Sequence, residues 1–137
     1  MPVLRNQFTG SFPFEIPANR KAIFMFTVQS AAKEVITFTK YPTKGDQQQG
    51  TNGKEYKQAS GQGTNLTGYE DAVLDGGYYT CSITANGNPN VKILQDTWTV
   101  DVEGKAMMTV IGAAVEDWTD NDYNDVFLQI SWWTYQG

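Results

Sequence analysis

The chain has 137 residues, of which 40% are hydrophobic and 13% aromatic, so its size and composition predict a single folded domain over residues 1–137 and exclude a disordered chain. The formal net charge is −5 and no cluster of basic residues occurs, which argues against nucleic acid as a partner. Cys81 is the only cysteine, which excludes an intrachain disulfide, and its strand-like surroundings predict a small core residue.

The first third of the chain predicts three strands. A short apolar piece between two prolines predicts an edge strand that ends in a turn at residues 16–19. The continuous apolar run 22–28 predicts a buried strand, and the alternating run 34–40 predicts a half-buried one. Because only a short link separates these two runs, we expect them to pair as a hairpin.

The remaining elements are also strands. The polar segment 42–63 is rich in glycine and glutamine and predicts an extended loop. Strands are expected at 66–74, 77–84, 91–102, 106–112 and 126–133, separated by turns rich in Gly and Asn. No stretch has sustained helical periodicity. The pattern therefore predicts an all-β protein, an antiparallel β-sandwich of about nine strands, with a metal-binding loop before the last strand.

That loop is the segment 116–125, which reads Glu-Asp-Trp-Thr-Asp-Asn-Asp-Tyr-Asn-Asp. It holds five carboxylates, two carboxamides and no basic residue. Hard oxygen donors at alternating positions are the ligands that calcium prefers, whereas the lack of His and the single distant Cys argue against zinc or copper. So many carboxylates suit two adjacent calcium ions, with some carboxylates bridging them.

The loop is not an EF-hand. The spacing of Asp120, Asp122 and Asn124 copies the first half of an EF-hand loop. However, Asp125 stands where the turn glycine belongs, and Ser131 stands where the bidentate glutamate belongs. The loop is also flanked by predicted strands instead of helices. A solvated acidic turn is the alternative reading, but ordinary turns do not place acidic and amide side chains at every second residue between two apolar strands.

In the pattern E-D-x-T-D-N-D-Y-N-D of residues 116–125, the chain resembles the calcium-dependent bacterial fucose-binding lectin II family. Further matches follow in the family's order, at residues 16–19, 29–30, 60–65 and 86–89. The resemblance implies a β-sandwich with two adjacent calcium ions that together bind hydroxyls of one monosaccharide, of the fucose or mannose type. It also implies a homo-dimer or higher homo-oligomer as the functional assembly.

The resemblance implies a set of metal ligands. Gln29 falls where the family uses a backbone carbonyl, and the terminal carboxylate of Gly137 would reach the site of a neighbouring subunit. The tail after Trp132 is two residues longer than the family's, which puts this last contact in question. The side chains implied as calcium ligands lie in the acidic loop: Glu116, Asp120, Asp122, Asn124 and Asp125. Of these, Asp122 and Asp125 would bridge the two ions.

The resemblance also implies sugar contacts. Asp117 and Asp120 would accept hydrogen bonds from the sugar. Ser30 and Ala31 fall on the small loop that tunes sugar preference, and the next residue, Ala32, stands where the family has glycine. Trp118 stands where the family has a small residue and would stack on the sugar. Elsewhere, Trp132 is expected in the core, Trp98 in the core or an interface, and Trp133 at an interface or the surface.

Two other classes of function compete with a lectin. A calcium-stabilised structural or adhesion module would use the ions only to make the loop rigid. A hydrolase would need a carboxylate pair such as Glu116 and Asp125, but calcium would keep both ionised and so remove the general acid. We therefore expect no enzyme activity. No cationic, apolar leader and no membrane-spanning apolar run is visible, so we expect a soluble protein, cytoplasmic or at the cell surface and extracellular if it follows the family.

Overall fold

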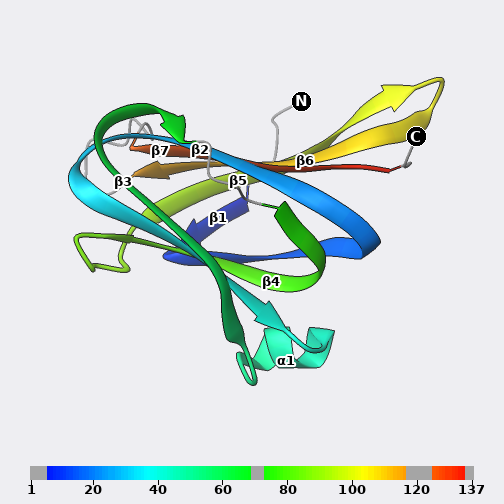
Figure 1. The fold of residues 1–137 in the computed structure, drawn as a ribbon, viewed down its shortest axis with the longest axis horizontal. Helices are drawn as coiled ribbons and strands as arrows, with labels where there is room; N and C mark the ends of the chain where they lie inside the picture. Colours follow the sequence, from blue (N-terminus) through cyan, green and yellow to red (C-terminus); the bar gives the residue numbers. More distant parts are fainter. Residues whose placement is uncertain (1–5, 69–72, 117–124, 135–137) are drawn as a thin grey trace.

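The computed structural model describes residues 6–68, 73–116 and 125–134, which form one curled antiparallel sheet and a short helix (Figure 1). The sheet order is β1-β5-β6-β7-β2-β3, and β4 also pairs with β2. This arrangement confirms the predicted all-β antiparallel class. The elements are β1 (Asn6–Thr9), β2 (Ser11–Tyr41), α1 (Lys44–Gln49), β3 (Lys54–Gly68), β4 (Val73–Ala85), β5 (Lys92–Val102), β6 (Lys105–Glu116) and β7 (Val126–Trp133).

Strand β2 is 31 residues long and serves three partners. Its pairing with β4 shifts register between Ile16 and Lys21, and its pairing with β3 shifts between Ser30 and Glu34. The middle stretch, 23–28, pairs with β7. If these three stretches are counted separately, the seven strands of the described residues become nine.

The expected hairpin between residues 22–28 and 34–40 is wrong, because both runs belong to β2 and pair with other strands. A tight hairpin needs residues such as Gly or Asn that accept a positive φ. The link 29–33 reads Gln-Ser-Ala-Ala-Lys and has neither. The chain therefore forms a bulge there and continues in the same strand.

The segment 42–63 is not the extended loop that its composition predicts, because it contains α1 and the first part of β3. Thr43 caps the helix by accepting the N–H of Asp46, and Gly50 ends it with a φ of 70°. Gln47 then docks the helix, since its Nε2 donates to the carbonyl oxygens of Phe14 (3.0 Å) and Tyr79 (2.8 Å). No helix within the described ranges is long and apolar enough to cross a membrane.

One cluster of buried side chains fills the inside of the curled sheet. Phe24 and Phe38 meet edge to face with ring centroids 4.6 Å apart, and Phe14 stacks on Tyr79 at 5.2 Å. Cys81 is buried as predicted, and burial raises the pKa of its thiol. These rings come from the alternating stretches of β2 and β4, so the core depends on both strands.

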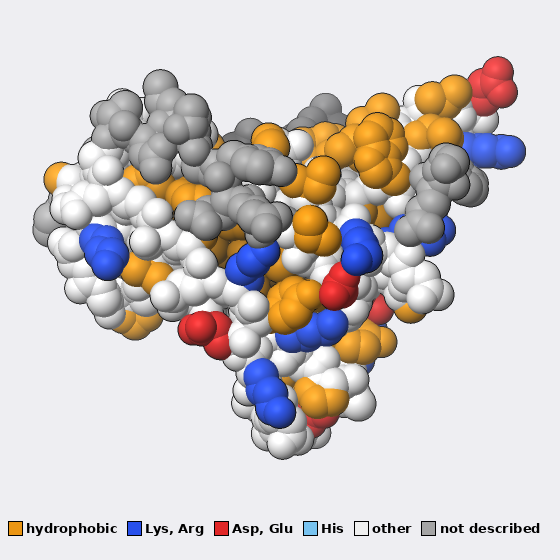
Figure 2. Space-filling model, in the orientation of Figure 1, with side chains coloured by type: hydrophobic (Ala, Val, Ile, Leu, Met, Phe, Trp, Pro, Cys, Tyr) orange, Lys and Arg blue, Asp and Glu red, His pale blue; other side chains and the backbone are white. Residues whose placement is uncertain are grey.

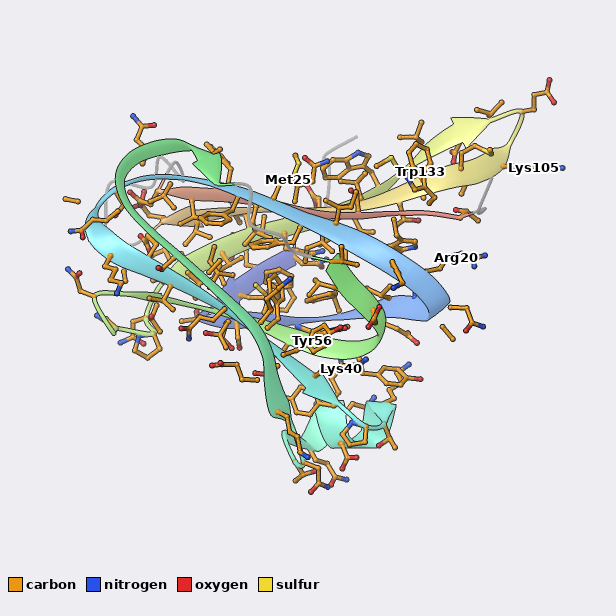
Figure 3. All side chains as sticks on the ribbon, in the orientation of Figure 1. Arg20, Met25, Lys40, Tyr56, Lys105 and Trp133 are labelled. Carbon is orange, nitrogen blue, oxygen red and sulfur yellow. The ribbon has the colours of Figure 1, made fainter. Side chains whose placement is uncertain are left out.

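A polar contact closes the core near α1. The hydroxyl of Tyr56 on β3 donates to Asp75 on β4 at 2.9 Å, and the ammonium of Lys40 lies 5.1 Å from the Tyr56 ring centroid (Figure 3). Lys21 lies 3.6 Å from the same carboxylate. The hydrogen bond from Tyr56, followed by the nearby lysines, lowers the pKa of Asp75. These contacts join β2, β3 and β4 at the end of the sheet remote from β5 and β6 (Figure 1).

Alternation along β4 yields a prediction about stability. Leu74 is fully buried, whereas Val73 beside it is 43% exposed. Leu74→Ala should lower the free energy of unfolding by about 2–5 kcal/mol, because it leaves a cavity. Val73→Ala should change it by about 0.5 kcal/mol or less, as surface substitutions do. Urea denaturation measures both, and equal losses for the two variants would contradict the described register of β4.

Candidate functional site

The sheet brings the two ends of the acidic loop together. Strand β6 ends at Glu116, and β7 begins at Val126, with Val115 paired to Val126. The N–H of Asp125 donates to the carbonyl of Val115 at 3.1 Å. The loop therefore leaves and re-enters the sheet on adjacent strands. Of the expected ligands and sugar contacts, six lie outside the described residues: Asp117, Trp118, Asp120, Asp122, Asn124 and Gly137.

Gln29 lies at the same point of the sheet. Its N–H donates to the carbonyl of Asp125 at 2.9 Å, directly after the pair Val28–Val126. Strands β2, β7 and β6 thus place Gln29, Asp125 and Glu116 side by side, although Gln29 is far from the other two in the sequence. The backbone of Gln29 therefore lies at the base of the acidic loop, and its role as a ligand remains a prediction.

The donors at this position suit calcium. Glu116 is only 1% exposed, and a buried carboxylate is costly unless a cation or several hydrogen-bond donors face it. The described part of the expected site offers two carboxylates and a backbone carbonyl, all of them hard oxygen donors. Within ranges 6–68, 73–116 and 125–134, no three His, Cys, Asp or Glu side chains are grouped closely enough to hold a metal.

The loop predicted to tune sugar preference is the bulge of β2. Between Ser30 and Glu34, three residues of β2 face a single residue of β3, Gln62. The Oγ of Ser30 accepts the N–H of Ala32 at 3.1 Å, and the Nε2 of Gln62 donates to the carbonyl of Ala31 at 2.8 Å. These bonds restrict the conformation of the bulge. A restricted bulge loses less conformational entropy when a ligand binds.

The turn after β4 holds the bulge from its other side. The N–H of Lys33 donates to Oδ1 of Asn86, and the N–H of Asn86 donates to the carbonyl of Lys33, both at 2.9 Å. Asn86 and Gly87 have φ values of 50° and 80°, as a tight turn between strands requires. The predicted turn is confirmed, but its contact with the bulge is not visible in the sequence, because it arises from the pairing of β2 with β4.

A cavity of about 420 Å³ lies between the bulge and this turn. Sequence reasoning missed it, since its walls come from segments more than fifty residues apart. Its polar side chains are three asparagines, and its other side chains are small or apolar. The lining residues are Ala31, Ala32, Ala85, Asn86, Asn88, Asn90 and Val91.

Glu34 lies next to the bulge and has no role predicted from the sequence. It is fully buried on β2, opposite Gly61 of β3 and Ala85 of β4. The alternation of residues 34–40 could have predicted its burial, because Glu34 shares the inward face with Ile36 and Phe38. Its carboxyl group lies beneath the same part of the sheet that carries the bulge.

The three tryptophans within the described residues fall on different sides of the sheet. Trp132 is 8% exposed and belongs to the core, as predicted. Trp133 is 59% exposed, which confirms its surface position. Trp98 is 47% exposed and lies over Gly112, where an added Cβ would come within 2.8 Å of its ring. Trp98 is therefore a surface residue, and a core position for it is wrong.

Solved structures share this fold, among them three lectins. The C-terminal domain of the BC2L-C lectin from Burkholderia cenocepacia matches with a TM-score of 0.68 and 21% identity over 96% of this chain and 100% of that domain. The lectin CV2L of Chromobacterium violaceum, solved with alpha-methyl-fucoside, matches with a TM-score of 0.64 and 23% identity over 91% of this chain and 96% of that chain. A high-affinity mannose-binding lectin of Ralstonia solanacearum matches with a TM-score of 0.64 and 21% identity, also over 91% of this chain and 96% of that chain.

No curated protein matches the sequence significantly. The sequence model of one family, however, matches residues 14–134, which is most of the chain. The match spans β2 to β7 and includes the bulge, both ends of the acidic loop and the loop itself. The chain therefore belongs to the fucose-binding lectin II (PA-IIL) family and is a carbohydrate-binding lectin.

Proposed function

We propose that the chain forms a single lectin domain that binds fucose- or mannose-type monosaccharides through two adjacent calcium ions in the acidic loop. The observation that carries this proposal is the convergence of Glu116, Asp125 and Gln29 on three neighbouring strands at the base of that loop. Asp120, Asp122 and Asn124 complete the ligand set, with Asp122 and Asp125 bridging. Gly137 of a neighbouring subunit is a further proposed ligand.

Calcium answers the main difficulty of binding a neutral sugar. Hydroxyl groups already bond well to water, so ordinary hydrogen bonds from the protein give a small net gain. Bound calcium would supply open coordination positions at which neighbouring hydroxyls replace water. Asp117 and Asp120 then accept hydrogen bonds from the same hydroxyls, and bonds to charged acceptors are the stronger kind. The bulge at Ser30 and Ala31 shapes the wall beside the sugar, and Trp118 packs on its apolar face.

Because the family is one of sugar-binding lectins, a non-enzymatic class, we assign no catalytic role to Glu116 or Asp125. The competing function that remains is a structural module in which the protein itself completes the coordination of both ions.

Removal of calcium separates these functions. In EDTA, binding to fucosylated and mannosylated glycans on an array should be lost. The melting temperature should fall as well, because ions bound only by the folded state stabilise it by about 2.7 kcal/mol at a hundredfold excess over Kd. Tight calcium binding without binding to any glycan would favour the structural module. An unchanged melting curve would show that calcium is not bound.

Substitutions within the site test the ligand assignment. Asp122→Ala should weaken calcium binding by more than about 100-fold, beyond the usual cost of changing a second-shell residue, and should abolish sugar binding. Gln29→Ala is the matched control, since Gln29 acts through its backbone and its N–H to Asp125 survives the change. Calorimetry with calcium and with the methyl glycoside measures both. Normal calcium and sugar binding by Asp122→Ala would show that the assignment is wrong.

The outer surface of β5, β6, β7 and β2 supports self-association. Its side chains form neighbouring rows, for example Val100 opposite Met108 and Met108 opposite Trp133. Hydrophobic side chains gather over the β5–β6 hairpin in Figure 2. Six residues, each 44–59% exposed, define what we name the outer apolar face: Ile23, Met25, Trp98, Val100, Phe127 and Trp133.

We assign the outer apolar face to a second copy of the chain. Contiguous apolar surface on a folded protein marks an interaction site. In a two-fold dimer each residue near the axis meets its own copy, so a face with few charges suits self-association. The family resemblance implies the same assembly, a homo-dimer or higher homo-oligomer.

Sedimentation tests this assignment. The unmodified chain should sediment as a dimer or larger, and Trp133→Lys should raise the dimer Kd by about 30-fold, as expected for an interface tryptophan. Gln58→Lys is the control, because Gln58 is exposed on β3 and pairs with Thr37, away from the outer apolar face. A monomer at high concentration, or equal effects of both variants, would contradict a dimer through this face.

A further inference from the structure

The cavity between the β2 bulge and the turn after β4 adjoins the proposed monosaccharide site. Ala31 and Ala32 line it, and Ala31 also belongs to the loop that shapes the wall of that site. Gln29, two residues earlier, is bonded to Asp125 at the base of the acidic loop. A ligand that extends from the acidic loop past the bulge toward the turn after β4 would reach this cavity.

The lining combines an apolar floor with hydrogen-bond donors. Val91 and Ala85 are buried, and the two alanines of the bulge add methyl groups. None of the described lining residues carries a charge. The volume of about 420 Å³ lies in the range of about 300–1,000 Å³ that is usual for small-molecule pockets. These properties suit a neutral ligand with both C–H faces and polar oxygens.

The orientation of two asparagine side chains is fixed by the backbone. The Oδ1 of Asn86 accepts the N–H of Lys33, and the Oδ1 of Asn88 accepts the N–H of Asn90, both at 2.9 Å. Because a backbone N–H can only donate, these contacts identify the oxygen of each carboxamide. The NH2 group of each side chain is then the donor offered to a ligand. The cavity thus favours a ligand that presents acceptor oxygens.

We propose that this cavity is a second sugar subsite. It takes the neutral hexose or N-acetylhexosamine residue that is linked to the monosaccharide at the acidic loop, and the NH2 group of Asn88 donates to a hydroxyl, ring or acetamido oxygen of that residue. The preferred ligand is then an oligosaccharide. This inference rests on the proposed lectin function, because the first residue must be held at the acidic loop.

Substitutions at Asn88 test the subsite in the full-length chain in millimolar calcium. Asn88→Asp keeps the oxygen that accepts the N–H of Asn90 but loses the NH2 donor, and Asn88→Ala loses both groups. Gln58→Ala is the matched control, because it removes an exposed carboxamide on β3 outside the cavity. Asn86 is left unchanged, since it holds the bulge and has a positive φ.

Calorimetry compares the methyl glycosides of fucose and mannose with disaccharides that end in the same sugars. At least one disaccharide should bind the unmodified chain about tenfold tighter than its methyl glycoside. Both Asn88 variants should weaken that disaccharide about three- to tenfold, as loss of one hydrogen bond does, and should leave the methyl glycoside unchanged. Gln58→Ala should change neither affinity.

The outcomes distinguish the subsite from the lectin function. If the methyl glycoside binds but no disaccharide binds tighter, or if Asn88 variants weaken both ligands equally, the subsite is overturned and the lectin function stands. If no sugar binds in calcium, the lectin function fails and the subsite fails with it.

Discussion

The structure depends on the sharing of one strand among three partners. Strand β2 pairs with β4 through its first and last stretches, with β7 through its middle, and with β3 from Phe26 to Lys40. The pairing of β2 with β3 shifts register at residues 31–33, which form the bulge. The same bulge also forms the wall beside the proposed sugar site.

The elements that depend on local pattern were predictable, whereas those that depend on tertiary pairing were not. Apolar runs bounded by turn residues predicted β6 and β7, and the turn at Asn86 and Gly87 followed from residues that accept positive φ. The link 29–33 was assigned to a hairpin because two neighbouring apolar runs usually pair. Helix α1 was missed because six residues are too few for a periodic pattern, although Thr43 and Asp46 carry the capping signal.

The candidate site divides in the same way. The acidic residues of the loop stand together in the sequence, so their spacing alone predicted calcium. The asparagines of the cavity lie in a separate segment, and only the pairing of β2 with β4 brings them near the bulge. Trp98 is expected in the core or an interface, and its exposed ring over Gly112 on the outside of the sheet excludes the core. The sequence pattern of a strand shows which side chains share a face, but it does not show which face packs against the core.

The pairing of β2 with β7 also has a consequence for biosynthesis. Phe24 and Ile130 are register partners, so an early segment of the nascent chain waits for almost the last segment to leave the ribosome. Topologies dominated by such distant contacts fold slowly, and an uncovered strand edge can recruit other chains in the meantime. We therefore expect the interval before β7 arrives to be the stage of folding at which the chain associates most readily with other chains.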